Sequence, residues 1–304
     1  MYKNIVPGLI SIDTNLKKLN GFYLSDNFDF YPSLDKKNLF HYTVGVDNKL
    51  EIPIGYEFRD GYFLKNKDIF YNHPPGIKLR FNRSKNEFIF NRMCSFIPFE
   101  IGRIFPAGRN IADLIELELF LSGYIIFRGS TCFLYNNDSV AIMSPSFNGK
   151  SSFLKKMLID DKIQYISEDI LILDVKSQVI YPTAPKEFSV SGSFKSGRKN
   201  IVLSDLLNTC NIINNPINLD NLLIVVNSTV DKSVSEKNLF DAFFLKSMSF
   251  FENSFVKSYI FENNLSGYIY QQICNIKNDL TIKCKFINVK NFDFESILNN
   301  LKNK

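Results

Sequence analysis

The pattern of hydrophobic and polar positions in this 304-residue chain changes near residue 110. Before that point, short segments of alternating or clustered apolar residues stand between Asn, Gly and Pro, as in FHYTVGV, KLEIPIGYEF and EFIFNRM. Short apolar runs that are bounded by turn residues are typical of β-strands. We therefore expect a smaller β-rich domain over residues 1–112, for which the pattern suggests no role.

A helix is predicted where the pattern changes, in the segment NIADLIELELFLSG. Apolar residues cover most of its surface, which favours a helix that is buried between two layers. Asn110 or an adjacent residue is expected to cap the start of this helix, and Gly123 stands just past its end.

The segments YIIFRG, TCFLYN and SVAIM then predict three short strands. The polar stretch SPSFNGKSS, residues 144–152, follows the third of them. After it, Phe153, Leu154, Met157 and Leu158 recur at helical spacing, and YISEDILILD predicts a buried strand. Strand, loop, helix and strand in this order begin an α/β unit, so residues 113–304 are expected to form a mixed sheet with flanking helices.

The rest of the chain, from residue 175 on, continues this alternation. Strands are expected in LDNLLIVVN and TIKCKFINV, and helices in EKNLFDAFFLKSM, SGYIYQQICNI and FESILNNLK. Residues 186–200 predict a polar loop in which Lys195, Arg198 and Lys199 could contact an acidic or phosphorylated group. A solvated loop with no binding role explains the same residues equally well.

Composition excludes several classes of function. With 36 basic and 31 acidic residues, the net charge of +5 is too small to predict a nucleic-acid-binding protein. The five cysteines are scattered and the two histidines lie far apart, which favours free thiols over a disulfide framework or a zinc site. The first residues show no signal-peptide pattern, and no apolar run is long enough to span a membrane. We expect a cytoplasmic protein with no membrane partner.

The stretch at residues 144–152 matches most of a phosphate-binding loop, in which Gly, four residues and Gly-Lys-Ser follow one another. Gly149, Lys150 and Ser151 complete the pattern, while Ser144 replaces its first glycine. In such a loop, backbone N–H groups and the following helix N-terminus bind phosphate, and the lysine adds a full charge. Serine is small enough for the first position unless φ must be positive there. The alternative is a Gly-Lys-Ser tripeptide that merely caps a helix.

Residues 124–174 resemble the HPr serine kinase family, which includes HPr-kinase-like domains found beside peptide-modification genes. Its members read as an apolar strand, a His-Ala-Ser or His-Gly-Ser segment, a hairpin, GxSGxGKS, a helix, and a strand with paired acids. This chain has Arg128-Gly129-Ser130, the stretch SPSFNGKSS, and Glu168-Asp169 in the same order. The resemblance extends loosely to residue 304 and implies a P-loop, HPr-kinase-like ATP-binding domain over residues 113–304.

The resemblance also implies the site, residue by residue. The nucleotide would be bound by the loop residues Ser144, Ser146, Phe147, Asn148, Gly149, Lys150, Ser151 and Ser152. Mg²⁺ would be held by Ser151, Glu168 and Asp169, and catalysis would rest on Asp169, Lys150 and Arg128. Asp169 would accept the proton of the acceptor hydroxyl.

Arg128 is the largest departure from the family, because it stands where members usually carry a histidine. An arginine stays charged and cannot relay a proton, although it can stabilise charge on a phosphoryl group. Phe147 and Asn148 also replace small loop residues. These departures favour the alternative of a domain that binds a nucleotide without catalysing transfer.

The resemblance therefore implies an ATP-dependent kinase that phosphorylates a Ser or Thr hydroxyl of a small protein or a ribosomally made peptide. Two alternatives stay open, which are a kinase for a small metabolite and a nucleotide-binding module without catalysis. Relatives in the family form rings, so a homo-oligomer is implied by the resemblance alone.

Overall fold

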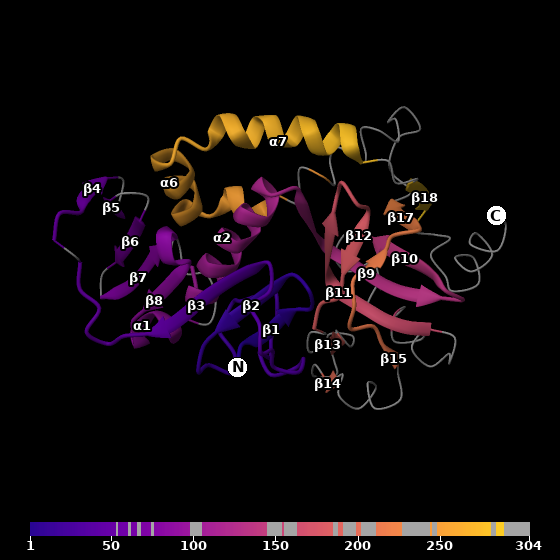
Figure 1. Ribbon diagram of the computed structural model, residues 1–304, viewed down its shortest axis with the longest axis horizontal. Coiled ribbons are helices and arrows are strands. Elements are labelled where there is room, and N and C mark those ends of the chain that lie inside the picture. Colours follow the sequence, from indigo (N-terminus) through magenta and orange to yellow (C-terminus); the bar gives the residue numbers. More distant parts are fainter. Residues whose placement is uncertain are drawn as a thin grey trace. The chain divides into compact units, whose positions relative to one another are not determined.

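The chain folds into mixed sheets with few helices, as expected for an α/β protein (Figure 1). A computed structural model describes residues 1–52, 54–59, 62–65, 68–73, 76–97, 105–144, 154, 163–184, 188–190, 199–201, 211–226, 244, 248–280 and 284–288. Two compact units are present: unit 1 comprises residues 1–124 and 248–278, and unit 2 comprises residues 125–247 and 279–304. The boundary expected after residue 112 falls inside a helix that belongs entirely to unit 1.

Unit 1 is built on an eight-stranded mixed sheet with the order β1-β2-β3-β8-β7-β6-β5-β4. Its strands are β1 (Lys3–Val6), β2 (Ile10–Asp13), β3 (Phe40–Val46), β4 (Glu57–Arg59), β5 (Tyr62–Lys65), β6 (Asp68–His73), β7 (Ile77–Asn82) and β8 (Glu87–Phe90). The pairs β2–β3 and β3–β8 are parallel, whereas the other neighbours are antiparallel. FHYTVGV is confirmed as a strand, which is β3.

Two other expected strands of unit 1 are shorter in the structure. EFIFNRM forms β8 only up to Phe90, because the Asn91 side chain accepts a hydrogen bond from Cys94 N and caps the short helix α1 (Arg92–Ser95). Among the described residues of KLEIPIGYEF, only Glu57 and Phe58 lie in a strand. Gly55 has a φ of 83°, which interrupts extended backbone.

The helices of unit 1 come from two distant parts of the chain. The part before residue 125 contains the 3₁₀ helix η1 (Arg83–Lys85), then α1 and α2 (Ala107–Leu121). The part after residue 247 contains the 3₁₀ helix η2 (Ser249–Glu252), then α6 (Ser254–Glu262) and α7 (Ser266–Asp279). The start expected for α2 was wrong, because Pro106 occupies the cap position and makes no side-chain cap. Gly108 N instead donates to Asn20 O at 3.1 Å. A Cβ at Gly108 would lie 2.4 Å from that oxygen, so this contact requires glycine. Gly123 ends α2 with a φ of 95°, as expected.

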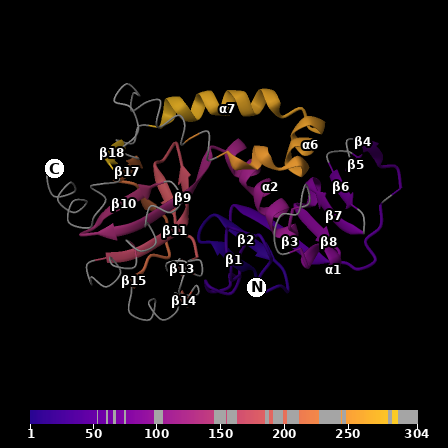
Figure 2. The same cartoon turned by 180° about the vertical axis from the view of Figure 1, so that it is seen from behind.

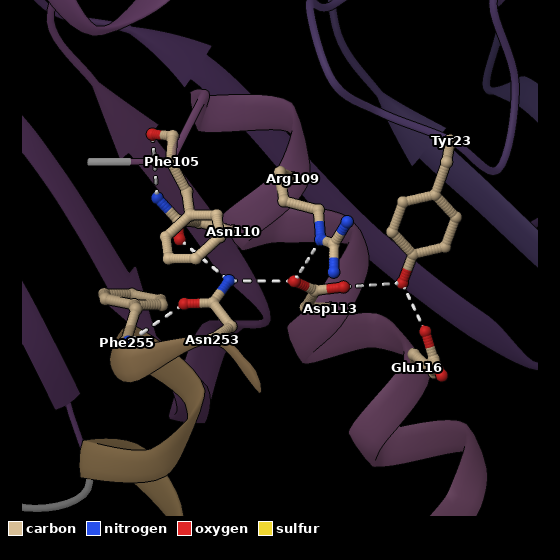
Figure 3. A network of polar contacts seen from close by, with 8 residues as sticks. All are labelled: Tyr23, Phe105, Arg109, Asn110, Asp113, Glu116, Asn253 and Phe255. Atoms are coloured by element: carbon tan, nitrogen blue, oxygen red, sulfur yellow. Dashed lines mark hydrogen bonds and ion pairs between the residues drawn. The ribbon is translucent and has the colours of Figure 1, made fainter. Parts of the chain in front are cut away.

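Asn110 belongs to a buried polar network instead of a helix cap (Figure 3). At its centre is Asp113, which is 0% exposed and accepts hydrogen bonds from Arg109 Nε at 2.6 Å and Tyr23 Oη at 3.0 Å. Asn253 Nδ2 donates to Asp113 Oδ2 at 2.9 Å and to Asn110 Oδ1 at 3.0 Å. Because a buried carboxylate is costly unless it is paired, these donors are what allow α2 to bury Asp113.

Asn253 uses its whole side chain in this network. Its two amide hydrogens serve Asn110 and Asp113, and its Oδ1 accepts from Phe255 N at 2.9 Å to cap helix α6. One buried amide therefore starts α6 and joins that helix to α2.

Unit 2 contains a second mixed sheet with the order β16-β12-β11-β9-β10-β17-β18, and β15 pairs with β11 beside it. The strands are β9 (Tyr124–Tyr135), β10 (Asp138–Met143), β11 (Ile163–Asp174), β12 (Val179–Tyr181), β15 (Asn211–Ile212), β16 (Ile217–Asn218), β17 (Asn221–Val226) and β18 (Cys284–Asn288). The pairs β10–β17, β17–β18 and β11–β15 are parallel, whereas β9–β10, β11–β12 and β12–β16 are antiparallel. SVAIM, YISEDILILD, LDNLLIVVN and TIKCKFINV are thus confirmed as containing strands.

Two expectations for unit 2 need correction. YIIFRG and TCFLYN form one continuous strand, β9, because Gly129 bends the strand with a φ of 72° without breaking it. The segment 186–200 is not wholly a loop, since β13 (Phe188–Val190) and β14 (Lys199–Ile201) pair in antiparallel fashion near its ends. Lys199 belongs to β14, whereas Lys195 and Arg198 lie outside the described residues.

Several further expectations can be compared with the described residues. SGYIYQQICNI is confirmed as a helix, which is α7. Cys94, Cys132 and Cys274 are confirmed as free thiols. Among the described helices, none has both the length and the apolar character that crossing a membrane requires. The helix expected in FESILNNLK lies outside the described residues.

A cross-strand pair near the start of the chain makes the stability of unit 1 depend on pH. His41 Nδ1 and Ser11 Oγ are 3.0 Å apart, and Ser11 Oγ also accepts from Asn38 N at 3.0 Å. The Ser11 hydroxyl hydrogen is therefore available to a neutral His41 ring and not to a protonated one. Burial and the nearby Lys37 ammonium lower the pKa of His41, and Asp13 and a hydrogen bond with Ser11 oppose this shift only in part.

We expect the wild-type protein to lose stability as the pH falls from about 7 to about 5, because the unfolded chain, with a His pKa of about 6.5, binds the proton more readily than the folded protein does. The contribution of His41 is complete above that pKa and declines below it. Urea unfolding midpoints at a series of pH values measure the slope. His41→Gln should reduce the slope, and an unchanged slope would contradict this role for His41.

Replacing Asn253 by Leu should lower the free energy of unfolding by about 2–3 kcal/mol, because the variant loses two donors to buried acceptors and the cap of α6. Chemical denaturation measures this loss. Asn263→Leu is the matched control, since Asn263 lies at the other end of α6 and its side-chain amide donates to Tyr259 O within that helix. Equal losses of unfolding free energy in the two variants would show that the network around Asp113 contributes no more to stability than the bond of Asn263.

Candidate functional site

Three neighbouring strands of unit 2, β11, β9 and β10, carry the predicted site residues that the structure describes (Figures 1 and 2). The central strand of the three is β9, with β11 along one edge and β10 along the other. Arg128 lies on β9, Glu168 and Asp169 lie on β11, and Ser144 directly follows β10. The structure thus brings residues that are up to 41 positions apart (169 − 128) onto adjacent strands of one sheet.

Ser144 marks where the chain leaves the sheet to begin the glycine-lysine-serine stretch. Strand β10 pairs with the second half of β9, and the last pair of this ladder is Met143 with Ser130. Ser144 N then donates to Gly129 O at 3.3 Å, and Ser144 is buried. The stretch therefore starts beside the middle of β9, at the Arg-Gly-Ser segment.

The bend of β9 has a local cause in each residue of that segment. Gly129 supplies the positive φ of 72°, which glycine adopts without a steric penalty. Ser130 is buried and its Oγ donates to Phe127 O at 2.9 Å, across the bend. Arg128 and Gly129 are half-buried between the buried Phe127 and Ser130, so the bend leaves part of β9 accessible to solvent.

Strand β11 has a corresponding bend at Asp169. This residue has a φ of 66° in the middle of a twelve-residue strand. Aspartate tolerates this left-handed conformation better than most residues, but a non-glycine residue there still costs about 1–3 kcal/mol. Asp169 is half-buried, whereas Glu168 and Ile170 on either side are buried. The strained position therefore leaves an acidic residue half-buried between buried neighbours in the middle of the strand.

Thr183 is a residue of this site that the sequence did not single out. It follows β12 and is buried, and its N and Oγ1 donate to Ile166 O at 3.1 Å and to Ile170 O at 3.4 Å. Those two carbonyls lie on either side of Glu168 and Asp169. A threonine just after a short strand carries no signal of such a contact, since the contact depends on the tertiary pairing of β12 with β11.

Most of the predicted nucleotide-binding loop lies outside the described residues. This applies to Ser146, Phe147, Asn148, Gly149, Lys150, Ser151 and Ser152, so their roles stay predictions. Leu154 is described, and it is helical and buried, in agreement with the helix expected after the loop.

The acidic pair offers the oxygen ligands that Mg²⁺ prefers. Mg²⁺ at nucleotide sites is usually held by one or two carboxylates together with phosphate oxygens and water. Glu168 and Asp169 are adjacent at the bend of β11 and fit this donor set, while Ser151 lies outside the described part of the chain. Within the described residues there is no cluster of three or more His, Cys, Asp or Glu side chains that could hold a metal.

Comparisons with known proteins give no independent assignment. No family model matches this chain, and no curated protein matches its sequence. The resemblance to HPr serine kinases therefore rests on the motifs of residues 124–174 alone.

Replacing Gly129 by Ala should destabilise the protein by about 1–2 kcal/mol, because a Cβ is unfavourable at a φ of 72°. Gly45→Ala is the control, since Gly45 also lies within a strand but a Cβ there would meet no atom within 4 Å. Denaturation midpoints of the two variants make the comparison. Equal stabilities would show that the bend of β9 does not depend on glycine.

Proposed function

We propose that this protein is an ATP-dependent kinase that transfers the γ-phosphoryl group to a Ser or Thr hydroxyl of a small protein or a ribosomally made peptide. The observation that carries the proposal is the strand order, in which Arg128 lies on β9, Asp169 lies on the neighbouring strand β11, and Ser144 follows the neighbouring strand β10. The Gly149-Lys150-Ser151 stretch follows Ser144, and the family resemblance gives each of these residues a role.

The nucleotide would be bound by the stretch after β10. Backbone N–H groups of residues 148–151 and the N-terminus of the following helix would face the phosphates. Lys150 would add a positive charge near the β- and γ-phosphates. Because Ser144 N is engaged by Gly129 O, the start of this stretch is tied to the bend of β9.

The acceptor would be activated from β11. Its hydroxyl oxygen would form a bond to the γ-phosphorus while the bond between that phosphorus and the β–γ bridging oxygen breaks, and ADP leaves. Asp169 would accept the hydroxyl proton. General-base assistance of this kind contributes about 10²–10⁴ in rate. Asp169 suits the task because the bend of β11 makes it half-exposed between buried neighbours.

Charge on the transferring group would be stabilised by two cationic side chains, Lys150 and Arg128. Arg128 lies at the bend of β9, next to Gly129, whose carbonyl accepts a hydrogen bond from Ser144 N. It keeps its charge at every relevant pH, so it would act electrostatically and not as a proton relay. Glu168 and Asp169 would hold Mg²⁺, which neutralises phosphate charge when it is bound.

The second candidate is a nucleotide-binding module that does not catalyse transfer. One observation favours it, which is that Arg128 replaces the histidine usual in the family. This candidate shares the nucleotide site with the kinase and differs only in lacking turnover. A kinase for a small metabolite would share both the nucleotide site and the turnover with the proposed kinase, and would differ from it in the acceptor.

Lys150→Ala should weaken ATP binding at least about tenfold, because a charge-assisted contact to phosphate contributes roughly 1.5–3 kcal/mol. Titration calorimetry with MgATP measures this loss. Lys156→Ala is the matched control, since Lys156 is expected on the other face of the helix that follows the loop. Unchanged ATP binding by the Lys150 variant would contradict the assignment of residues 144–152 as a phosphate-binding loop, and with it the kinase proposal.

Asp169→Asn should leave ATP binding within about twofold and reduce transfer by about 10²–10⁴, because asparagine keeps the left-handed backbone but cannot accept the proton. The assay follows transfer from γ-labelled ATP to Ser- and Thr-containing peptides encoded by neighbouring genes, with free serine and sugars in parallel. Asp174→Asn, at the end of the same strand, is the control. ATP binding without transfer by the wild-type protein would favour the non-catalytic module.

A further inference from the structure

We propose that Thr183 is a positioning residue that holds the bend of β11 and thereby sets the direction of the Asp169 carboxylate. The mechanical part of this inference rests on hydrogen bonds of the described residues. Its consequence for phosphoryl transfer rests on the proposed function.

Strand β11 has different partners before and after the bend. Before the bend, Gln164 and Tyr165 pair with β15 in parallel fashion. After it, residues 172–174 pair with β12 in antiparallel fashion. Thr183 bonds to β11 between these two ladders, at the level where the strand carries Glu168 and Asp169.

The hydrogen bonds of Thr183 differ from those of a regular ladder. In the antiparallel register of β11 and β12, Ile172 pairs with Tyr181. If this register continued for two more residues, Thr183 would lie opposite Ile170. Its Oγ1 does donate to Ile170 O at 3.4 Å, but its backbone N donates to Ile166 O at 3.1 Å, four residues earlier. One residue therefore bonds to both ends of the segment 166–170. Ser167, Glu168 and Asp169 lie between these ends and form the bend.

Thr183 is itself held in place and protected from water. It is 1% exposed, and its carbonyl accepts a hydrogen bond from the hydroxyl of Tyr165, a 0% exposed residue, at 3.3 Å. Threonine also has a restricted χ1, which limits the directions available to its hydroxyl. In a buried site no water competes for Ile170 O, so loss of the hydroxyl would leave that carbonyl without this donor.

The consequence for Asp169 follows from its conformation. A residue at a φ of 66° keeps that conformation only when its surroundings over-determine it. Removing the Thr183 hydroxyl frees one end of the segment 166–170, so the Asp169 carboxylate would sample more directions. The proposed nucleotide loop follows β10, which is not bonded to Thr183, so ATP binding should be largely spared. A misplacement of about 1 Å in a catalytic group can cost about 10²-fold in rate.

The test compares Thr183→Val, which removes the hydroxyl but keeps the shape, with Thr183→Ser, which keeps the hydroxyl. Thr183→Val should lower kcat for peptide phosphorylation about tenfold to a hundredfold and leave the KM for ATP within about twofold. Thr183→Ser should restore most of kcat. Thr131→Val is the matched control, because Thr131 is a buried residue whose hydroxyl has no hydrogen-bond partner within the described part of the chain. A wild-type kcat in Thr183→Val would overturn the positioning role.

Amide hydrogen exchange separates this inference from the proposed function. In Thr183→Val, amides of residues 166–170 should exchange about tenfold faster, while those of β10 should not change. Tyr165→Phe, which removes the bond to the Thr183 carbonyl, should give a smaller effect in the same direction and serves if the Val variant does not fold. If the wild-type protein transfers no phosphoryl group, the kinase proposal fails, and amide exchange alone tests whether Thr183 holds the bend of β11. Unchanged exchange at residues 166–170 in these variants would overturn the inference.

Discussion

Unit 2 depends on the hydrogen bonding of two strands that each carry a residue at positive φ. A strand cannot continue a regular ladder through such a residue, so other groups must satisfy the carbonyls around it. At Gly129 of β9, the Ser130 hydroxyl bonds to Phe127 O, and Ser144 N bonds to Gly129 O. At Asp169 of β11, Thr183 provides the corresponding bonds. In both strands a hydroxyl side chain bonds to a carbonyl beside the bend, and a charged residue at the bend is half-buried.

The two units solve the problem of buried polar groups in different ways. In unit 1 the polar groups belong to side chains: Asp113 is buried on helix α2 and is satisfied by Tyr23, Arg109 and Asn253 (Figure 3). In unit 2 the groups around the two bends are mostly backbone carbonyls. The first arrangement fixes how helices pack within unit 1, whereas the second leaves Arg128 and Asp169 half-exposed in the middle of buried strands. The predicted site residues Arg128 and Asp169 lie at these two bends.

Much of the secondary structure could be predicted from the sequence, because alternating or continuous apolar residues mark β3, β10, β11, β17, α2 and α7. The sites where prediction failed are those where a tertiary contact overrides a local signal. Gly129 looked like the end of a strand, but it bends β9 instead. Asn110 looked like a helix cap, but Asn253, which bonds to it, lies 143 positions away in the sequence. Thr183 had no sequence signal, since its role depends on the register of β12 against β11. The motifs predicted one site from Arg128, Ser144 and Asp169, and the strand order places them on or after three neighbouring strands, while their roles stay predictions.

The order of the chain has a consequence for biosynthesis. Each unit is closed by a segment that is translated after the other unit has been largely made: Asn253 bonds to Asp113 across 140 positions, and β18 pairs with β17 across residues 227–283. In a nascent chain that has emerged only to residue 247, Asp113 lacks its partner Asn253. The same chain lacks β18, the strand that pairs with β17. Neither unit is encoded by one uninterrupted stretch, so synthesis of unit 1 is complete only after residues 125–247 of unit 2 have been made.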